Sequence, residues 1–413
     1  MIHDRSPSIG ASGLRIAMLA PFAVHGPKGT TRWRVMPLAR SLAALGHTVR
    51  VVVPPYDSPA EAGKSWLDQG VEVLNLKLPR GGAQSRVLPL VAGLVRETAA
   101  WQPDVIHSFK PKGYTGLAAA WLTRRGYVVV QDSDDWEAGW NVAAGYPRAW
   151  QQLFARQERC GLRDAVAVTV ASRWLERFAI RLRGDARGVF YLPNGIEMGR
   201  FGSFSCSQEA MVPPLTLPHS IKRVLLYTRF GETTPAAIWR VWSMVLAQRP
   251  AAQLVVVGDG STGEGQELAR LAAMACASHA IVLLGWQPPQ VLPGLLASMD
   301  GALFPVLDSP LNRAKSPMRL LDVLAAGVPA ATQAVGEYGS YVVDGETGLL
   351  TAPGDATALA AAVVRLLDDV QLARRLGAEA ARRTAVVHSW PRLAEAALAA
   401  YDTALRSRGR KHR

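Results

Sequence analysis

The sequence has little cysteine and no long apolar run. It contains three cysteines in all, an odd number, widely spaced and without a Cys-x-x-Cys pair: Cys160, Cys206 and Cys276. This argues against a disulfide framework or a thiolate metal site, and it predicts a cytoplasmic protein. A membrane-spanning helix needs about 20 consecutive apolar residues, and no stretch approaches that length. The N-terminal segment LRIAMLAPF is too short and interrupted for a secretory signal, and we interpret it as a first strand.

Acidic residues are scarce relative to basic ones. The chain has 33 Asp and Glu against 46 Lys and Arg, a formal charge of +13. Such a charge attracts nucleic acid, anionic lipid or phosphorylated small molecules. There is no zinc-finger spacing and no RNA-binding motif, and apart from the tail RSRGRKHR the arginines are scattered. The charge therefore favours a phosphate-bearing substrate or peripheral attachment to a membrane surface over nucleic acid.

The apolar residues alternate between short β-rich runs and Ala- and Leu-rich helical stretches, a pattern typical of parallel α/β sheets. Hydrophobic residues make up 49% of the chain and charged residues 19%, as in a globular protein. A helix is expected from about 31 to 45, ending at Gly46. In the first half, strands are expected at 16–20, 49–53, 71–74, 105–107, 128–130, 167–170 and 189–191.

A chain of 413 residues is too long for one ordinary core, so we predict two domains. The Ser- and Pro-rich stretch 201–220 has no helical or strand period and is interpreted as a linker. The predicted organisation is an N-terminal α/β domain at 1–200, the linker, a second α/β domain at 221–385, and a closing segment at 386–413. Ligands of such sheets bind beyond the carboxyl ends of the strands, so the informative residues should follow the strands.

Two glycine-containing loops follow predicted strands. VVVGDGSTGEG places Gly258, Gly260 and Gly263 in the spacing of a dinucleotide fingerprint. No acidic residue stands at the end of the next strand, where that fingerprint needs a ribose ligand, so a tight turn beside another ligand is favoured. HGPKGTTRWR holds Gly26 and Gly29 before a helix, which fits either a phosphate-binding loop or an ordinary connection.

Acidic and aromatic residues gather in VVVQDSDDWEAGW, beyond another strand. The residues concerned are Asp132, Asp134, Asp135 and Trp136. Clustered carboxylates can chelate a metal, bind sugar hydroxyls or act as a general base, and tryptophan offers a flat face to a sugar ring. A helix N-cap with satisfied acids is the structural alternative. The segment HSFKPKGY, at an earlier strand end, adds His107, Lys110 and Lys112.

In combination these segments resemble the GT-B retaining glycosyltransferases of family four, which use nucleotide-sugars. LARSLAALGHTVRVVVP resembles the family's first helix and second strand, and PDVIHSF one of its later strands. AVTVASRWL, YLPNGIEMGRF, VVVGDG, VLLGW, LLDVLAAGVPAAT and VGEYGSYVVDGETGLLTAPGD follow in the family's order over nearly the whole chain. HSWPRLAEAALAAYDTAL resembles the C-terminal helix that crosses back to the N-domain. The resemblance implies two facing Rossmann-like domains.

The resemblance also implies roles, with the donor on the C-domain and the acceptor on the N-domain. LLDVLAAG stands where the family has LLEAMAxG, so Asp322 would hold the ribose hydroxyls; a surface ion pair with Arg319 is the alternative. Ser316 would cap the helix, with Pro317 at its first position, leaving N–H groups for the diphosphate. The implied donor-binding set is Gly26, Gly29, Arg229, Gly258, Gly260, Ser316, Pro317, Met318 and Asp322. The implied acceptor-binding set is Lys110, Asp132, Asp135 and Trp136.

Three departures from the family pattern bear on catalysis. The second glutamate of the acidic motif is replaced by Ala314. Arg229 fits the arginine that contacts donor phosphates, but its lysine partner is replaced near Thr234, and Lys315 would restore that charge. The family's histidine after the fifth N-domain strand is absent, which makes Asp134 the substitute. The predicted catalytic residues are therefore Arg229, Lys315 and Asp134.

The predicted function is the transfer of a sugar, with retention, from a nucleotide-sugar donor to a glycan, lipid-linked or small-molecule acceptor. No metal, no cofactor and no nucleic acid is expected. The basic residues would stabilise the leaving diphosphate. Two alternatives stay open. A GT-B-type nucleotide-sugar epimerase would need acid and base groups on both sides of its cleft, and a degenerate, non-catalytic nucleotide-sugar-binding protein would account for the missing family residues.

Overall fold

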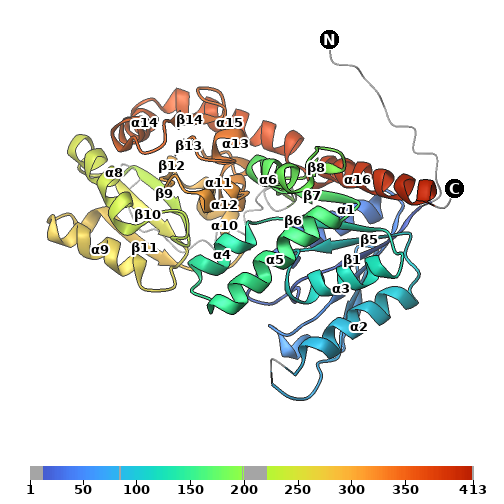
Figure 1. Ribbon diagram of the computed structural model, residues 1–413. Helices are drawn as coiled ribbons and strands as arrows, with labels where there is room; N and C mark the ends of the chain where they lie inside the picture. The colour runs from blue at the N-terminus through green and yellow to red at the C-terminus, as the bar shows by residue number, and fades with distance from the viewer. Residues whose placement is uncertain (1–12, 83–84, 198, 200–220, 412–413) are drawn as a thin grey trace, which may run out of the picture. The chain divides into compact units, whose positions relative to one another are not determined.

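The computed structural model describes residues 13–82, 85–197, 199 and 221–411, and the chain divides into two α/β units (Figure 1). The first unit comprises Met1–Val170, Glu176–Leu192 and Ala394–Arg413, and the second comprises Ala171–Leu175 and Pro193–Leu393. The predicted fold class of two α/β domains is confirmed. The predicted linker at 201–220 lies outside the described residues.

The first unit is built on an eight-stranded sheet in the order β3-β4-β2-β1-β5-β6-β7-β8. All neighbours are parallel except β3, which runs antiparallel to β4. The strands are β1 (Arg15–Leu19), β2 (Thr48–Val53), β3 (Ser65–Asp68), β4 (Val71–Asn75), β5 (Val105–Phe109), β6 (Val129–Ser133), β7 (Ala167–Val170) and β8 (Val189–Tyr191). The seven predicted strands are present. Sequence reasoning missed β3, because this short edge strand has no buried side chain and no apolar run.

Helices cover both faces of this sheet, as parallel strands require. The predicted helix at 31–45 is present as a π-helical segment η1 (Thr31–Val35) followed by α1 (Met36–Ala44). Gly46 ends it with φ of 89° and an N–H bond to the Ala43 carbonyl. The other helices are η2 (Pro59–Glu61), α2 (Val87–Ala100), α3 (Gly113–Arg124), α4 (Glu137–Ala143), α5 (Arg148–Asp164) and α6 (Arg173–Arg183).

The last helix, α16 (Trp390–Lys411), returns to the first unit, as the resemblance implied. Its Tyr401 hydroxyl lies 2.8 Å from Nδ1 of His107 on β5, and Nε2 of the same ring lies 3.0 Å from the Thr169 hydroxyl. His107 is fully buried, and burial lowers the pKa of its imidazole to about 3. This histidine therefore joins the C-terminal helix to the sheet and has a structural role.

The second unit is built on a six-stranded parallel sheet in the order β11-β10-β9-β12-β13-β14. Alternate residues of its central strands enter two different cores, with Leu225 and Val255 on one face and Leu226 and Val256 on the other. The strands are β9 (Arg223–Tyr227), β10 (Gln253–Val257), β11 (Ile281–Gly285), β12 (Gly301–Phe304), β13 (Ala330–Gln333) and β14 (Gly348–Thr351). The helices are α8 (Pro235–Gln248), α9 (Glu264–Met274), η4 (Ser278–Ala280), α10 (Leu292–Ala297), α11 (Pro310–Ala314), α12 (Met318–Ala325), α13 (Tyr338–Tyr341), α14 (Ala356–Asp368) and α15 (Val370–Val387).

Across the described chain, no helix combines the length and the apolar composition that spanning a bilayer demands.

Candidate functional site

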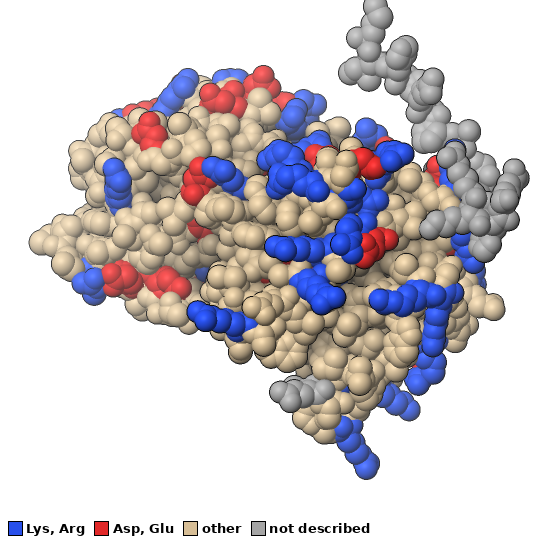
Figure 2. Space-filling view, in the orientation of Figure 1, with Lys and Arg blue, Asp and Glu red and all other residues tan. Residues whose placement is uncertain are grey.

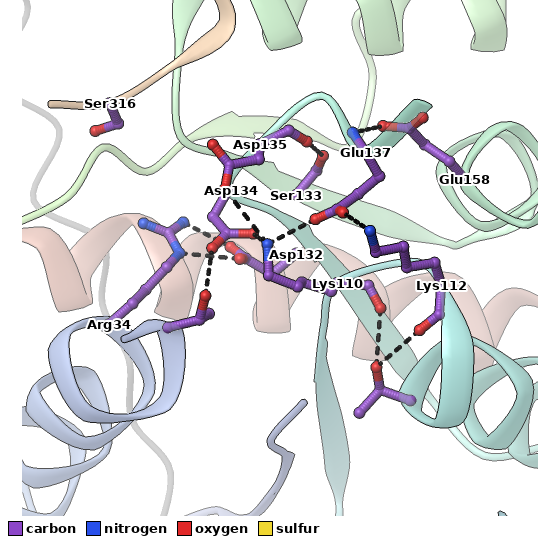
Figure 3. Close-up of polar contacts among 12 residues, drawn as sticks. Arg34, Lys110, Lys112, Asp132, Ser133, Asp134, Asp135, Glu137, Glu158 and Ser316 are labelled. Carbon is purple, nitrogen blue, oxygen red and sulfur yellow. Dashed lines mark hydrogen bonds and ion pairs between the residues drawn. The ribbon is translucent and has the colours of Figure 1, made fainter. Parts of the chain in front are cut away.

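The acidic loop after β6 forms a buried charge network with the lysines that follow β5 (Figure 3). Lys110 Nζ lies 2.9 Å from Asp134 Oδ1 and 2.6 Å from Glu137 Oε1. It also lies 3.4 Å from Asp135 Oδ2, and Lys112 makes a second ion pair with Glu137. Because β5 and β6 are adjacent parallel strands, their carboxyl ends bring these side chains to one edge of the sheet.

Glu158 of α5 fixes the beginning of α4. Its two carboxylate oxygens accept hydrogen bonds from the backbone N–H groups of Glu137, at 2.8 Å, and Ala138, at 2.9 Å. These are groups that a helix leaves without an internal partner, so Glu158 caps α4 from another helix. Burial, with a further effect of the Glu137 charge, raises the pKa of Glu158 to about 7. Sequence reasoning missed this residue because it lies 21 residues from the loop that it supports.

Asp134, the predicted catalytic carboxylate, is buried and fully engaged. Besides Lys110, it accepts a hydrogen bond from the Thr30 hydroxyl at 3.1 Å. Burial alone would raise its pKa, but Lys110, Arg34 and Thr30 more than offset this and hold the pKa below the usual value. A carboxylate that holds its proton so weakly is a poor general base near neutral pH. The geometry gives Asp134 an electrostatic and positioning role.

Asp135 has the properties of a base that the sequence assigned to its neighbour. Its side chain is 29% exposed, whereas that of Asp134 is 8% exposed. Burial raises the pKa of Asp135 to about 6; the charges of Asp134 and Glu137 act in the same direction, and Lys110 opposes them. The pKa of Asp135 is therefore closer to neutral pH than that of Asp134, and its side chain is more exposed to solvent. Trp136, which follows it, is half-buried at the beginning of α4.

Asp132 is part of the fold rather than an open acceptor ligand, which corrects the sequence prediction. Arg34 of η1 contacts both carboxylate oxygens, with Nε 2.9 Å from Oδ1 and a terminal nitrogen 2.6 Å from Oδ2. The two side chains are 2% and 0% exposed. Thr169 donates to Oδ2 at 2.7 Å, and Arg34 also donates to the Leu192 carbonyl at 2.8 Å. The pair joins η1 to β6, β7 and the segment after β8.

Three carboxylates of the acidic loop have a spacing that suits a metal ion. One oxygen each from Asp134, Asp135 and Glu137 lies within 4.8 Å of the others. The Lys110 ammonium contacts all three, so the cluster is already served by a cation. Lys110, predicted to bind the acceptor, is itself 6% exposed and neutralised by these contacts. A metal would have to displace it.

Two carboxylates, those of Asp57 and Glu61, accept hydrogen bonds from the backbone of the glycine loop after β1. Ala23 N–H donates to Asp57 Oδ1 at 2.9 Å, and His25 N–H donates to Glu61 Oε1 at 3.2 Å. A Cβ at Gly26 would lie 2.7 Å from Asp57 Oδ2, so a larger residue there would have to push this carboxylate aside. At Gly29 a Cβ would lie 2.8 Å from the Trp33 ring. Both glycines remain predicted phosphate contacts.

In the second unit, Arg229 follows β9 and is exposed, with no ion-pair partner in the described part of the chain. Gly258, after β10, has φ of 103°, and a Cβ there would lie 2.0 Å from the Thr228 carbonyl oxygen. Only glycine permits this approach. Gly260 lies in the same loop. A cavity beside these strand ends is lined by Tyr227, Thr228, Glu232, Thr233, Pro317 and Arg319, among others.

Lys315 has a partner that sequence reasoning missed. Its Nζ donates to the Gly231 carbonyl at 2.9 Å and to Glu232 Oε1 at 3.0 Å, and the lysine is 6% exposed. Arg319 forms an ion pair with the same Glu232 oxygen at 3.7 Å. Burial would raise the pKa of Glu232, but these two cations hold it below the usual value. Charge balance was the available signal, because a buried lysine needs a carboxylate.

Asp322 lies in the middle of α12 and is 6% exposed, so it does not form the surface ion pair considered as an alternative. Ser316 does not cap this helix, which corrects the sequence prediction. Its hydroxyl accepts a hydrogen bond from Asn194 N–H at 2.9 Å and lies 2.5 Å from the Tyr341 hydroxyl. The helix begins at Met318, and Pro317 precedes it. Ser316 instead joins the segment after β8 to α12 and α13.

Comparison with known proteins supports a family assignment. Residues 29–195 match the family model described as a glycosyl transferase 4-like domain, and residues 224–369 match the model described as glycosyl transferases group 1. Together these matches cover more than half of the chain.

Three similar proteins match this chain over nearly their full length. A phosphatidyl-myo-inositol mannosyltransferase of Mycobacterium leprae is 25% identical over 404 residues, covering 94% of this chain and 97% of that protein. Sucrose-phosphate synthase from Thermosynechococcus elongatus has a similar fold, with a TM-score of 0.70, 21% identity and coverage of 95% and 100%. The Anabaena protein HepE, solved in complex with UDP and glucose, has a TM-score of 0.69, 18% identity and coverage of 94% and 98%.

Proposed function

We propose a nucleotide-sugar-dependent transfer for this chain, which belongs to the group 1 glycosyltransferases of the GT-B fold. It is a glycosyltransferase, and nothing in its structure or its relatives favours the epimerase or the non-catalytic protein. The donor, the stereochemistry and the site residues form the proposal: the donor is a nucleotide-sugar, the anomeric configuration is retained, and the acceptor is a hydroxyl of a glycan, a lipid-linked or a small molecule.

The single observation that carries the donor site is Arg229, a cation at the end of β9 that is exposed and holds no carboxylate. An anion can reach it without displacing another charge. Asp322 lies buried on α12, and a carboxylate can accept hydrogen bonds from both hydroxyls of a ribose. HepE was solved in complex with UDP and glucose, and its similar fold supports a nucleotide-sugar donor for this chain. Lys315 is already neutralised by Glu232, so we expect it to contribute less than Arg229.

The proposed chemistry is charge stabilisation without metal or cofactor. The bond between the anomeric carbon and the diphosphate oxygen breaks, and the acceptor oxygen forms the new bond on the same face of the sugar. Negative charge accumulates on the departing diphosphate, and Arg229 stabilises it. In the first unit, Asp135 is the carboxylate best placed by exposure and pKa to contact the acceptor hydroxyl and to accept its proton as the new bond forms.

Nucleotide release from a panel of UDP-, GDP-, ADP- and dTDP-sugars, with and without acceptors, tests the proposal. We expect release that an acceptor stimulates, and a loss in kcat/KM of roughly a hundredfold in Arg229→Gln. Arg240→Gln, which removes an exposed arginine of α8, is the matched control and should behave as the wild type. Isomerised donor without an acceptor would instead establish an epimerase, and binding without turnover a non-catalytic protein.

We also propose peripheral attachment to anionic lipid through the first unit. On the face shown in Figure 2, basic side chains outnumber acidic ones over α3, α5 and α6. Helix α5 (RAWQQLFARQERCGLRD) combines basic residues with Trp150 and Leu153, which are 39% and 43% exposed. Each basic residue near such a surface contributes about 1 kcal/mol. At low salt, the protein should sediment together with phosphatidylglycerol vesicles but not with phosphatidylcholine vesicles. Equal sedimentation with both kinds of vesicle would refute the proposal.

A further inference from the structure

Lys28 differs from the other lysines at the carboxyl edge of the first sheet. Lys110 and Lys112, after β5, are both ion-paired with carboxylates of the acidic loop. Lys28, in the loop after β1, has its Nζ 4.4 Å from the centre of the Phe22 ring and 5.3 Å from that of Tyr56. The Tyr56 hydroxyl lies 3.4 Å from the same nitrogen. Within the described ranges, no carboxylate reaches ion-pair distance of Lys28.

The rings below Lys28 form an aromatic ledge, which consists of Phe22, Tyr56 and Tyr114. The centres of Phe22 and Tyr56 are 6.2 Å apart, and those of Tyr56 and Tyr114 are 4.8 Å apart. The three residues follow β1, β2 and β5, and β1 pairs with the other two strands. All three side chains are partly exposed, so the aromatic ledge leaves ring surface for a ligand. Such faces suit the apolar side of a sugar or cyclitol ring.

The electrostatic surroundings favour an anion at Lys28 over one at Lys110. Burial lowers the pKa of Lys28, and the like charges of Lys112 and Lys110 act in the same direction. Asp57 opposes them, but this carboxylate is held by Ala23 N–H through Oδ1. An anion at Lys28 would gain a cation without breaking an ion pair. At Lys110 it would have to displace three carboxylates.

The acidic loop carries the opposite charge. Its network contains two lysines against three carboxylates, those of Asp134, Asp135 and Glu137. An excess of carboxylate repels an anionic group and accepts hydrogen bonds from hydroxyls. A ligand with an anionic group at one end and hydroxyls at the other is therefore complementary to this edge of the sheet.

We infer that the acceptor of this transferase is a phosphorylated polyol, whose phosphate monoester binds Lys28 while its ring rests on the aromatic ledge. A phosphate monoester is favoured over a carboxylate because it carries close to two negative charges, and lysine binds phosphate as a point charge. This inference rests on the proposed function and assigns Lys28 as a residue that determines acceptor specificity.

The test compares acceptors in matched pairs, using the full chain and the donor found by nucleotide release. The pairs are glucose with glucose 6-phosphate and myo-inositol with myo-inositol 1-phosphate; glucuronate is the carboxylate probe. At least one phosphorylated acceptor should exceed its neutral counterpart at least tenfold in kcat/KM. Lys28→Gln should remove that preference by raising the KM of the phosphorylated acceptor. The kcat/KM of the neutral acceptor and the KM of the donor should stay unchanged. Lys28→Arg, which keeps the charge, should retain most of the preference.

Lys64→Gln removes an exposed lysine elsewhere on the first unit and should leave the preference intact. Raising the salt concentration should weaken the preference in the wild type but have no effect on the neutral acceptor. The inference is overturned if no phosphorylated acceptor is preferred, if glucuronate serves equally well, or if Lys28→Gln impairs neutral and phosphorylated acceptors alike, as a purely structural lysine would. Absence of any acceptor-stimulated release refutes the proposed function itself, whereas release that ignores Lys28 refutes only this inference.

Discussion

Replacing Asp132 by asparagine should unfold the first unit at a markedly lower temperature without acting directly on the site. Asp132 lies on β6, between β5 and β7 in the sheet. Both of its carboxylate oxygens accept hydrogen bonds, from Arg34 and from Thr169. Asparagine has nearly the same shape, but it carries no charge and places an N–H₂ group against the guanidinium. The substitution therefore leaves Arg34 buried as an uncompensated cation.

The magnitude follows from the burial of the pair, whose side chains are 2% and 0% exposed. Removing one partner of a buried ion pair costs about 3 to 5 kcal/mol of the free energy of unfolding. For a unit of this size, each kcal/mol corresponds to about 2 to 4 °C, which gives a decrease in melting temperature of roughly 6 to 20 °C. Replacing both partners, in Arg34→Met with Asp132→Leu, should cost less than the sum of the single changes, because no charge is left unpaired.

Differential scanning calorimetry of Arg34→Met, Asp132→Leu and the double variant measures this coupling, and Asp132→Asn is measured beside them. Asp185→Asn is the matched control, because Asp185 forms an ion pair with Arg187 whose side chains are 41% and 91% exposed. That control should melt as the wild type does, since exposed pairs contribute little. A decrease in Asp132→Asn no larger than that of the control, or strictly additive single changes, would refute the assignment of Asp132 to the fold.

Three further predictions concern the site. Asp322→Asn weakens charge-assisted hydrogen bonds worth about 1.5 to 3 kcal/mol, so calorimetric titration should show nucleoside diphosphate affinity lower by roughly ten- to a hundredfold, and unchanged affinity would contradict the ribose role. Activity should rise with pH through about 6 as Asp135 loses its proton, and a pH profile of Asp135→Asn that keeps this limb would disprove its role as base. The pKa of Glu158 in the folded state is about 7, above the ordinary 4.5, so the folded state binds this proton more tightly than the unfolded state does. Protonated Glu158 therefore stabilises the fold, by about 3 kcal/mol at most. This stabilisation is complete below about pH 4.5 and is lost as the pH rises to 7. The melting temperature of Glu158→Gln should fall less over that interval than that of the wild type, and parallel curves would contradict the prediction.

The fold could be predicted from the sequence because its information is local. Seven strands of the first unit were placed with ends within about three residues, since each is an apolar run bounded by polar or turn residues. Gly46 marked the end of a helix because a left-handed φ favours glycine. Strand β3 was missed because it is short, lies at an edge and gains its pairing from β4 rather than from its own pattern. The π-helical segment η1, which precedes α1, likewise has no sequence signature.

For the site, the sequence predicted which residues follow the ends of strands, but not what each of them does. The acidic loop and the lysines were expected near one edge of the sheet, and they meet there. Their roles could not be read from residue type. Asp132 and Asp134 were indistinguishable from Asp135 in the sequence, because their difference comes from Arg34 and Lys110, which lie 98 and 24 residues away. A local pattern carries no information about such partners.

The distribution of ion pairs separates cations that hold the fold from cations that can meet a ligand. Lys110 and Lys315 were both predicted to contact substrates, and both contact carboxylates that the sequence analysis did not single out, Glu137 and Glu232. Neutralising a buried lysine in this way avoids an unpaired charge in the interior. Arg229 and Lys28 lack such a partner within the described chain, and each is exposed at a strand end. An unpaired cation keeps its full attraction for a phosphate, so the anionic ends of donor and acceptor are expected at Arg229 and Lys28, which follow strands at the carboxyl edges of the two sheets.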